Sequence, residues 1–247
     1  MTGQKIAIAA APLMKPLHLE MGGKNPNIIF NDCDFEAAIN GTLRAAFANQ
    51  GQICLCGSRI MVEKELYPKF RDELVKRINN LVQGDPLNEQ TDQGAVVSKA
   101  HFDKIISAIE LAKKEGGKIL TGGTPLERPG YYIRPTLIEG LGQNCQTNQE
   151  EIFGPVATIC PFEKVEEVIE MANATKYGLA GSIWSKDIQK AEELALQIDS
   201  GILWINTWLM RDLRTPFGGM KESGRGREGG QYILKFFSQT KNICLKE

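Results

Sequence analysis

The chain contains the apolar run Asn27-Ile28-Ile29-Phe30 and a second one, Arg59-Ile60-Met61-Val62. Short apolar runs of this kind are typical of strands buried inside a sheet. Between them, apolar residues recur at three- and four-residue spacing, as on one face of a helix, at Phe35, Ala38, Ile39, Leu43, Ala46 and Phe47. Because a strand, a helix and a strand follow one another, the stretch predicts a βαβ unit with two parallel strands.

The same alternation continues toward the C-terminus. Helical spacing of apolar residues predicts helices over residues 70–81, 98–112, 165–172 and 188–198. Runs of strand character lie between them, at residues 118–120, 132–138, 156–161, 181–184 and 202–206. Polar segments with proline, residues 85–93 and 122–130, favour loops. The expected fold class is therefore α/β, built from parallel βαβ units.

The two ends of the chain fit this pattern less well. Residues 1–16 predict the end of a helix and a turn between Pro12 and Pro16, and residues 17–19 predict a short strand. Nothing upstream offers that strand a partner. Residues 237–247 predict a terminal strand that pairs with something outside the domain.

The composition is that of an ordinary soluble globular protein, with 42% hydrophobic and 24% charged residues in 247 and a formal net charge of -1. Near-balanced charge argues against nucleic acid or an anionic membrane surface as the main partner. No apolar run reaches the length of a membrane span, and the alanine-rich start meets Pro12 and Lys15 too early for a secretory signal. We therefore expect no nucleic acid and no membrane as partners.

Six cysteines are scattered along the chain, and only Cys54 and Cys56 lie close together. Their one-residue gap is not the spacing of a zinc site or of a CxxC redox motif. With only His18 and His101 besides, a metal site is not expected. A chain of this size needs no disulfides for stability, so free thiols and a reducing, cytoplasmic setting are predicted.

Cys54 ends the polar, turn-forming stretch Asn49-Gln50-Gly51-Gln52-Ile53-Cys54. Such a backbone leaves N–H groups free around the sulfur, which would stabilise a thiolate and later an oxyanion. The plain alternative is a buried cysteine that acts as a small inert hydrophobe. Cys56 is equally close, so spacing alone does not decide between the two thiols.

Glu20 follows the short predicted strand and precedes Gly22-Gly23. A carboxylate at a strand end, beside glycines that let a ligand approach, is a candidate general base. A solvated glutamate explains the same position equally well. A later run, residues 224–229, matches GxGxxG but follows a loop rather than a strand, so we interpret it as a glycine-rich turn.

Five motifs, beginning with Leu19-Glu20-Met21-Gly22-Gly23-Lys24, resemble in order and spacing the aldehyde dehydrogenase superfamily. They cover residues 19–26, 47–54, 150–156, 173–179 and 216–224. Five ordered motifs over nearly the whole chain are highly specific. The resemblance implies an α/β catalytic domain of aldehyde dehydrogenase type, preceded by a truncated remnant of the dinucleotide-binding domain.

The resemblance implies a thiol mechanism. Cys54, and not Cys56, stands at the family's NxGQxC position and is similar to the nucleophile that attacks the aldehyde. Glu20 resembles the base that activates the thiol or the hydrolytic water. The implied reaction forms a Cys54 thioester as hydride passes to NAD, and water then attacks the thioester.

A cofactor site is implied as well. Glu151 resembles the carboxylate that holds the nicotinamide ribose, and Phe153 the side chain that packs beside the nicotinamide. Leu19 and Gly22, in the first motif, complete the expected cofactor-binding residues. NAD is the implied cofactor, and NADP is also possible.

Residues 206–219 are similar to the subgroup that acts on 2-hydroxymuconic and 2-aminomuconic semialdehydes. Such substrates carry a carboxylate, so an arginine at the pocket would add a charge-assisted hydrogen bond of about 1.5 to 3 kcal/mol. Arg211 is favoured over Arg214, which abuts Thr215-Pro216, and Trp208 is expected beside it. A surface salt bridge is the alternative role for either arginine.

Family members are roughly twice as long, and their front half holds most of the cofactor domain and an oxyanion-hole asparagine. Loss of one such donor slows a reaction about 10²- to 10³-fold, so little dehydrogenase activity is expected from this chain alone. The expected division is residues 1–20 as a cofactor-domain remnant, 21–227 as the catalytic domain and 228–247 as a docking and oligomerisation tail.

Two alternatives remain open from the sequence. The chain could be a non-catalytic fragment that oligomerises, or a cofactor-free thiol esterase that uses Cys54 and Glu20. A homo-oligomer is expected in either case, because a sheet without its neighbours exposes edge strands and apolar surface.

Overall fold

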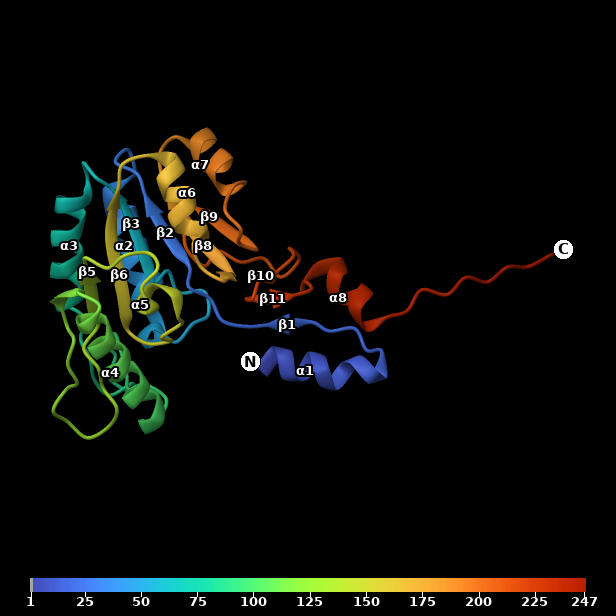
Figure 1. Cartoon of the computed structure of the whole chain (residues 1–247), viewed down its shortest axis with the longest axis horizontal. Helices are drawn as coiled ribbons and strands as arrows, with labels where there is room; N and C mark the ends of the chain where they lie inside the picture. The colour runs from blue at the N-terminus through green and yellow to red at the C-terminus, as the bar shows by residue number, and fades with distance from the viewer. Residues whose placement is uncertain (1) are drawn as a thin grey trace.

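A seven-stranded sheet forms the body of the protein in the computed structural model, which describes residues 2–247 (Figure 1). The strands lie in the order β4 (Lys118–Thr121), β5 (Thr136–Glu139), β6 (Val156–Phe162), β3 (Arg59–Glu63), β2 (Pro26–Ile29), β8 (Ala180–Trp184) and β9 (Ile202–Ile205). All neighbours are parallel except β4 and β5, which are antiparallel with an irregular register between Ile119 and Thr121. The predicted α/β class with parallel βαβ units is confirmed.

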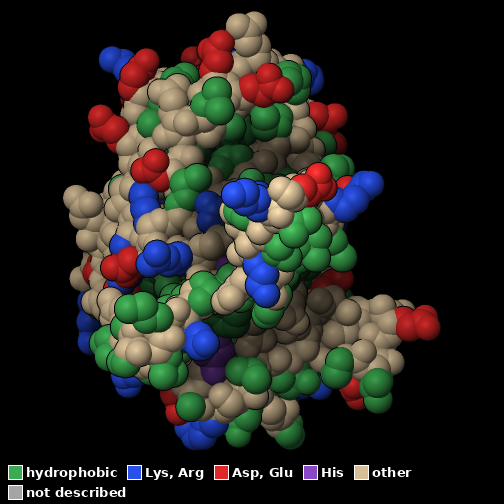
Figure 2. All heavy atoms as spheres, turned by 90° about the vertical axis from the view of Figure 1, so that its right-hand side faces the viewer, with side chains coloured by type: hydrophobic (Ala, Val, Ile, Leu, Met, Phe, Trp, Pro, Cys, Tyr) green, Lys and Arg blue, Asp and Glu red, His purple; other side chains and the backbone are tan. Residues whose placement is uncertain are grey.

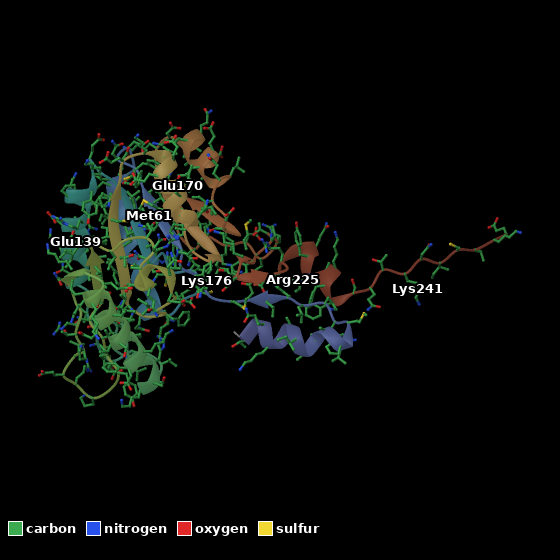
Figure 3. The ribbon with its side chains drawn as sticks, viewed as in Figure 1. Met61, Glu139, Glu170, Lys176, Arg225 and Lys241 are labelled. Atoms are coloured by element: carbon green, nitrogen blue, oxygen red, sulfur yellow. The ribbon has the colours of Figure 1, made fainter. Side chains whose placement is uncertain are left out.

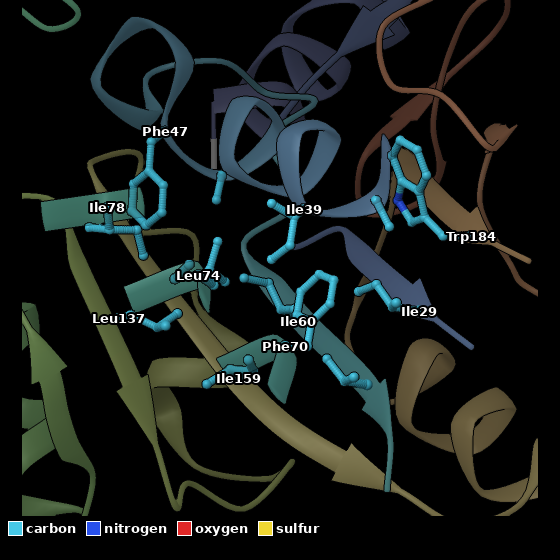
Figure 4. Packing of buried hydrophobic residues seen from close by; sticks show 14 of the residues in the cluster. Ile29, Ile39, Phe47, Ile60, Phe70, Leu74, Ile78, Leu137, Ile159 and Trp184 are labelled. Atoms are coloured by element: carbon cyan, nitrogen blue, oxygen red, sulfur yellow. The ribbon is translucent and has the colours of Figure 1, made fainter. Parts of the chain in front are cut away.

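Helices cover both faces of this sheet. On one face α2 (Phe35–Phe47) and α3 (Tyr67–Asn79) pack against Ile29 and its neighbours, as Figure 4 shows. On the other face α6 (Val165–Asn173) and α7 (Ile188–Ala195) pack against Ile28. Successive residues of a strand point to opposite faces, so the apolar run around Ile28 and Ile29 supplies both layers of the core.

Helix starts are set by capping side chains. Asp34 accepts a hydrogen bond from the Ala37 N–H at 3.0 Å and so begins α2, and Ser98 begins α4 (Lys99–Lys114) in the same way. These caps satisfy N–H groups that have no partner inside the helix. α4 covers the far end of the sheet, against β5 and β6, through a separate apolar cluster around Ile105 and Ile109.

Several boundaries differ from the sequence prediction. The strand predicted over residues 132–138 is confined to β5, and Ile133 forms only an isolated bridge with Pro125. The helix predicted over 188–198 ends at Ala195, and the short helix α5 (Gln146–Gln149) was not anticipated. Short elements carry too few periodic residues to be recognised locally.

The N-terminal strand has its partner downstream, near the other end of the chain. Helix α1 (Thr2–Ala10) and the 3-10 turn η1 (Ala11–Leu13) lead into β1 (Leu19–Glu20), which pairs antiparallel with β11 (Gly224–Arg225). The partner lies within the glycine-rich run, where a Cβ at Gly224 would lie 2.4 Å from the Leu19 carbonyl oxygen. The turn interpretation of that run therefore holds, and glycine is needed for close approach. Just before it, β10 (Met220–Lys221) pairs with β7 (Tyr177–Gly178).

The chain ends differ in character from the body. Helix α8 (Gly230–Phe237) has no buried residue and includes Phe237, so the predicted terminal strand does not begin at that residue. Residues 238–247 have no assigned strand or helix within this chain, and their pairing with something outside the domain stays a prediction. We call residues 2–20 and 224–247 the terminal arm; it projects from the sheet body, with Arg225 on the arm and Met61 inside the sheet (Figures 1 and 3).

Apolar side chains are exposed along this arm. Figure 2 views the molecule from the arm's side and shows hydrophobic side chains among Lys and Arg. The exposed ones include Ile8, Leu13, Met14, Tyr232, Leu234, Phe237, Ile243 and Leu245. Among residues 2–247, no helix has the length and hydropathy needed to cross a membrane.

Candidate active site

The cysteine loop follows α2 directly. After Phe47 the turn η2 (Ala48–Gly51) places Asn49, Gln50 and Gly51 in left-handed backbone, with φ of 50°, 55° and 68°. A Cβ at Gly51 would lie 2.0 Å from the Gly154 carbonyl oxygen, so only glycine fits there. This tight turn reverses the chain and presents Cys54, which is partly exposed.

Asn25 holds the cysteine loop in place. Its buried side chain donates to the Cys54 carbonyl oxygen at 2.8 Å and to that of Cys56 at 2.9 Å. Its Oδ1 accepts the Ala180 N–H at 3.0 Å, which ties the loop to β8. Sequence reasoning missed Asn25, although it stands in the first motif, directly after Lys24. The loop is thus fixed by a side chain at the start of β2.

The structure distinguishes the two neighbouring thiols. Burial raises the pKa of Cys54, and the nearby carboxylates of Glu151 and Glu20 raise it further. Cys56 is buried, and burial raises the pKa of its thiol to about 12. The expected stabilisation of the thiolate by free N–H groups does not dominate, so Cys54 rests as a thiol and needs a base to ionise.

Glu20 lies at the end of β1, on the terminal arm. His18 Nε2 lies 3.5 Å from its Oε1, and Arg227 and Glu228 lie close enough for their charges to shift its pKa in opposite directions. Burial is the largest effect and raises the pKa of Glu20, which makes this carboxylate a better base. The charge of Glu20 is among those that raise the pKa of Cys54.

Glu151 follows α5 and faces the first motif. The Gly23 N–H donates to its Oε1 at 3.0 Å, and among residues 2–247 this is the carboxylate's one hydrogen-bond donor. A Cβ at Gly22 would lie 2.2 Å from Oε2, so Gly22 makes room for the carboxylate. Burial raises the pKa of Glu151. An acceptor oxygen therefore remains for a ligand hydroxyl.

The other predicted cofactor residues lie on either side of Glu151. Leu19 and Gly22 line an open groove between Glu151 and α1. Phe153 lines a separate cavity beyond it and adopts a left-handed backbone, with φ of 61°. His101, which sequence reasoning missed, lies with Nε2 2.6 Å from the Phe153 carbonyl oxygen and so fixes this strained conformation.

The predicted substrate residues divide into two kinds. Trp208 is buried and its indole N–H donates to the Leu55 carbonyl oxygen at 3.0 Å, so it supports the cysteine loop. Arg211 lies 3.9 Å from the ring centre of Phe217 and 3.6 Å from Glu228, and its charge lowers the pKa of Cys54. Arg214 is exposed and pairs with the nearby Asp212. These positions favour Arg211 over Arg214 as the arginine near the thiol.

Metal ligands are not brought together. Among residues 2–247, no group of three or more His, Cys, Asp or Glu side chains could hold a metal ion. The six cysteines are unpaired in the same residues. The groups whose charges act on the Cys54 thiol are the carboxylates of Glu151 and Glu20, which raise its pKa, and the guanidinium of Arg211, which lowers it.

Comparison with known proteins gives a consistent match. The model of the "Aldehyde dehydrogenase family" matches residues 1–243. A 2-aminomuconic 6-semialdehyde dehydrogenase of Pseudomonas sp. is 44% identical over 99% of this chain and 51% of its own length. A 2-hydroxymuconic semialdehyde dehydrogenase of Pseudomonas sp. (strain CF600) is 43% identical over the same shares. The chain therefore spans about half the length of the curated relatives it matches.

Solved structures of aldehyde dehydrogenases are similar to this chain as well. A betaine aldehyde dehydrogenase of Staphylococcus aureus, in complex with NAD+, matches with a TM-score of 0.92 at 40% identity, over 95% of this chain and 47% of that one. The NAD+ complex of an aldehyde dehydrogenase from Bacillus cereus gives a TM-score of 0.94 at 39% identity, over 96% and 48%.

Proposed function

The chain belongs to the aldehyde dehydrogenase family, and we propose that it carries the catalytic thiol of an NAD-dependent aldehyde oxidation. The observation that carries this proposal is the loop in which Asn25 fixes Cys54, partly exposed, between the carboxylates of Glu20 and Glu151. The neighbouring thiol of Cys56 is buried, and we assign it no part in the reaction.

The chain's own residues can perform the acyl-transfer steps. Glu20 removes the proton from Cys54, whose sulfur attacks the aldehyde carbon and forms a thiohemiacetal. When bound, NAD supplies the acceptor for the hydride that leaves this carbon. Once Glu20 has released the first proton to solvent, it takes a proton from the water that attacks the Cys54 thioester, and the acid leaves as its bond to the Cys54 sulfur breaks. The raised pKa of Glu20 suits both proton transfers.

The residues present fit one end of NAD. Glu151 offers an oxygen without a protein donor to a ribose hydroxyl, and Gly22 leaves the space that this carboxylate needs. Leu19 lines the same groove, and Phe153 would pack near the nicotinamide. NAD is supported by the NAD+ complexes of similar enzymes, and NADP stays a prediction.

The proposed substrate is a semialdehyde that carries a carboxylate. The similar Pseudomonas enzymes are named for 2-aminomuconic and 2-hydroxymuconic semialdehydes. Arg211, near the thiol and only partly paired, would bind the carboxylate, and Trp208 would shape the pocket through the loop it supports.

We also propose a domain division, an oligomeric state and a cellular setting for the chain. Residues 1–20 would belong to the cofactor-binding part, 21–227 to the catalytic domain and 228–247 to a tail for docking. The exposed apolar arm favours a homo-oligomer, and the unpaired cysteines favour a cytoplasmic setting. Nucleic acid and membranes are not proposed as partners. Alone, the chain should be weakly active as a dehydrogenase, or act only as a cofactor-free thiol esterase.

Ester hydrolysis tests the thiol assignment without the cofactor. We expect the purified chain to hydrolyse p-nitrophenyl acetate, Cys54→Ala to lose this activity and Cys56→Ala to retain it. Circular dichroism should show that both variants fold. Retained hydrolysis in Cys54→Ala would remove Cys54 from its role. Separately, steady-state NADH formation from a semialdehyde by this chain alone would contradict the expected weak activity.

A further inference from the structure

His18 lies beside the proposed base. It directly precedes β1, two residues before Glu20, and alternate residues of an extended chain point to the same side. Its Nε2 lies 3.5 Å from the Glu20 Oε1, and among residues 2–247 this is the one ion-pair contact of that carboxylate. Neither the thiol mechanism nor the cofactor site described above uses the imidazole.

The Nε2 atom of His18 has no other partner. Only 12% of the side chain is exposed, and Nε2 itself is buried without a hydrogen bond among residues 2–247. A buried ring nitrogen without a partner is costly. The distance of 3.5 Å is slightly longer than an ordinary N–H···O hydrogen bond, so a small movement would pair Nε2 with Glu20.

Two further contacts seat the ring. The ring centres of His18 and Phe236, in α8, lie 5.9 Å apart with an interplanar angle of 67°, which is the edge-to-face geometry that aromatic pairs prefer. A Cβ at Gly226 would lie 3.2 Å from the His18 Cδ2, so glycine leaves the ring its space. These contacts restrict the imidazole and keep Nε2 beside Glu20.

The other charged groups that act on Glu20 have partners of their own. Arg227 donates to two backbone carbonyl oxygens, at 2.9 and 2.7 Å, and Glu228 lies 3.6 Å from Arg211. Burial raises the pKa of Glu20, whereas the charge of a protonated His18 lowers it. His18 is therefore the side chain placed to hold this carboxylate.

We propose that His18 positions Glu20 for catalysis: its Nε2–H donates to Oε1, which leaves Oε2 to accept the proton of the Cys54 thiol and later that of the attacking water. His18 itself takes up no proton in either step. The role matters because, among residues 2–247, β1 pairs only with the two residues of β11, so the backbone alone holds the carboxylate weakly. The inference rests on the proposed function, in which Glu20 is the base.

Two substitutions separate the N–H donor from the ring. His18→Phe keeps an aromatic ring against Phe236 and has no donor, whereas His18→Gln loses the ring and keeps a side-chain N–H. We expect p-nitrophenyl acetate hydrolysis at pH 8 to show a kcat lower by about ten- to a hundredfold in His18→Phe, with little change in KM. The rate in His18→Gln should stay within about threefold of the wild type.

A merely structural role predicts the reverse order, because the ring that packs on Phe236 is lost only in His18→Gln. Equal rates in the two variants, or a slower rate in His18→Gln, would overturn the proposal. Circular dichroism should show that both variants fold.

The pH profile is a second readout. His18→Phe removes the charge that lowers the pKa of Glu20, so the acid limb of ester hydrolysis should move to higher pH. Phe236→Leu loosens the ring but keeps the imidazole and should leave the acid limb in place. The same other ionisable groups interact with Glu20 in both variants: Arg227, Glu228 and Cys54. An acid limb that moves equally in both, or in neither, would contradict the proposal.

The hydrogen on Nε2 can be observed without any catalytic activity. The sequence contains only two histidines, His18 and His101, so NMR of the ring nitrogens gives two sets of signals, which His18→Phe assigns. We expect the neutral ring of His18 at pH 8 to carry its hydrogen on Nε2. A hydrogen on Nδ1 would refute the proposed donation whatever the kinetics show.

Failure of this inference can be told apart from failure of the proposed function. Hydrolysis that survives in Cys54→Ala would contradict the proposed function. Hydrolysis that is lost in Cys54→Ala and in Glu20→Gln, but is equal in His18→Phe and His18→Gln, would contradict only the role of His18.

Discussion

The sheet body and the terminal arm hold the two halves of the proposed acid–base pair in different ways. Cys54 lies on a loop that buried Asn25 fixes to β8, packed against a cluster of buried apolar side chains. Glu20 lies on β1, which among residues 2–247 pairs only with the two residues of β11, beside helices with almost no buried residues. Local stability follows buried contacts, so the nucleophile is held rigidly and the base is not.

The largest expected effect contrasts one phenylalanine from each region. Phe70 in α3 is fully buried, whereas Phe237 in α8 is 78% exposed (Figure 4 shows Phe70). Phe70→Ala should lower the free energy of unfolding by about 3 to 5 kcal/mol, because it leaves a cavity. Phe237→Ala should change it by about 0.5 kcal/mol or less. Urea denaturation measures the free energy of unfolding of both variants. Equal losses would contradict the expected difference between the sheet body and the terminal arm.

The second-largest effect is expected at Asn25, whose side chain holds the cysteine loop in place. Asn25→Ala leaves the carbonyl oxygens of Cys54 and Cys56 and the Ala180 N–H without their partner. We expect a loss of about 2 to 4 kcal/mol and slower ester hydrolysis, since unsatisfied buried groups are costly and the thiol is no longer positioned. Thermal denaturation and p-nitrophenyl acetate kinetics check this. Unchanged hydrolysis would mean that the loop is held by other contacts.

The body also contains one destabilising feature, the buried amine of Lys24. Its pKa in the folded chain, about 7, lies below the ordinary value of 10.5. Between these values the unfolded chain binds a proton that the folded chain has released, so stability should rise with pH. The slope is at most about 1.4 kcal/mol per pH unit.

Comparison with Lys24→Met isolates this effect. The variant should lack the added slope between pH 7 and 10 and should be more stable than the wild type at pH 7. Parallel curves of unfolding free energy against pH would contradict the lowered pKa of Lys24.

The smallest effect on stability is expected in the arm. Gly224→Ala places a Cβ 2.4 Å from the Leu19 carbonyl oxygen and should separate β1 from β11. Because that pairing is short and exposed, the loss should be about 1 kcal/mol or less, yet ester hydrolysis should fall as Glu20 shifts. Gly142→Ala, whose Cβ meets nothing within 4 Å, is the matched control. Full activity in Gly224→Ala would show that the position of Glu20 does not depend on the β1–β11 pairing.

The sheet body and the terminal arm also differ in how much of their structure could be predicted from the sequence. The spacing around Ile28, Ile29 and Phe47 reports local periodicity, so the βαβ unit and the α/β class were predictable. The partner of β1 was not, because residues 224–225 reach it from the other end of the chain. The terminal strand over 237–247, expected to pair with something outside the domain, stays a prediction, because residues 2–247 of this chain offer it no partner strand.

The site was predictable where motifs mark it and not where burial decides it. Spacing alone left Cys54 and Cys56 equivalent, and the resemblance to the NxGQxC motif favoured Cys54; the structure adds that Cys56 is buried. Asn25 and His101 act through side-chain hydrogen bonds to backbone that is distant in the sequence, and such bonds leave no periodic signal. Lys24 was overlooked because a lysine is ordinarily expected at the surface.

Hydrogen exchange tests the central claim, a rigid nucleophile and a weakly held base, most directly. Amide exchange followed by mass spectrometry compares peptides over residues 17–21 with peptides over residues 47–57 and β2. The account predicts exchange in residues 17–21 that is faster by about two orders of magnitude or more. Equal protection in β1 and β2 would contradict it and would place Glu20 on the same rigid scaffold as Cys54.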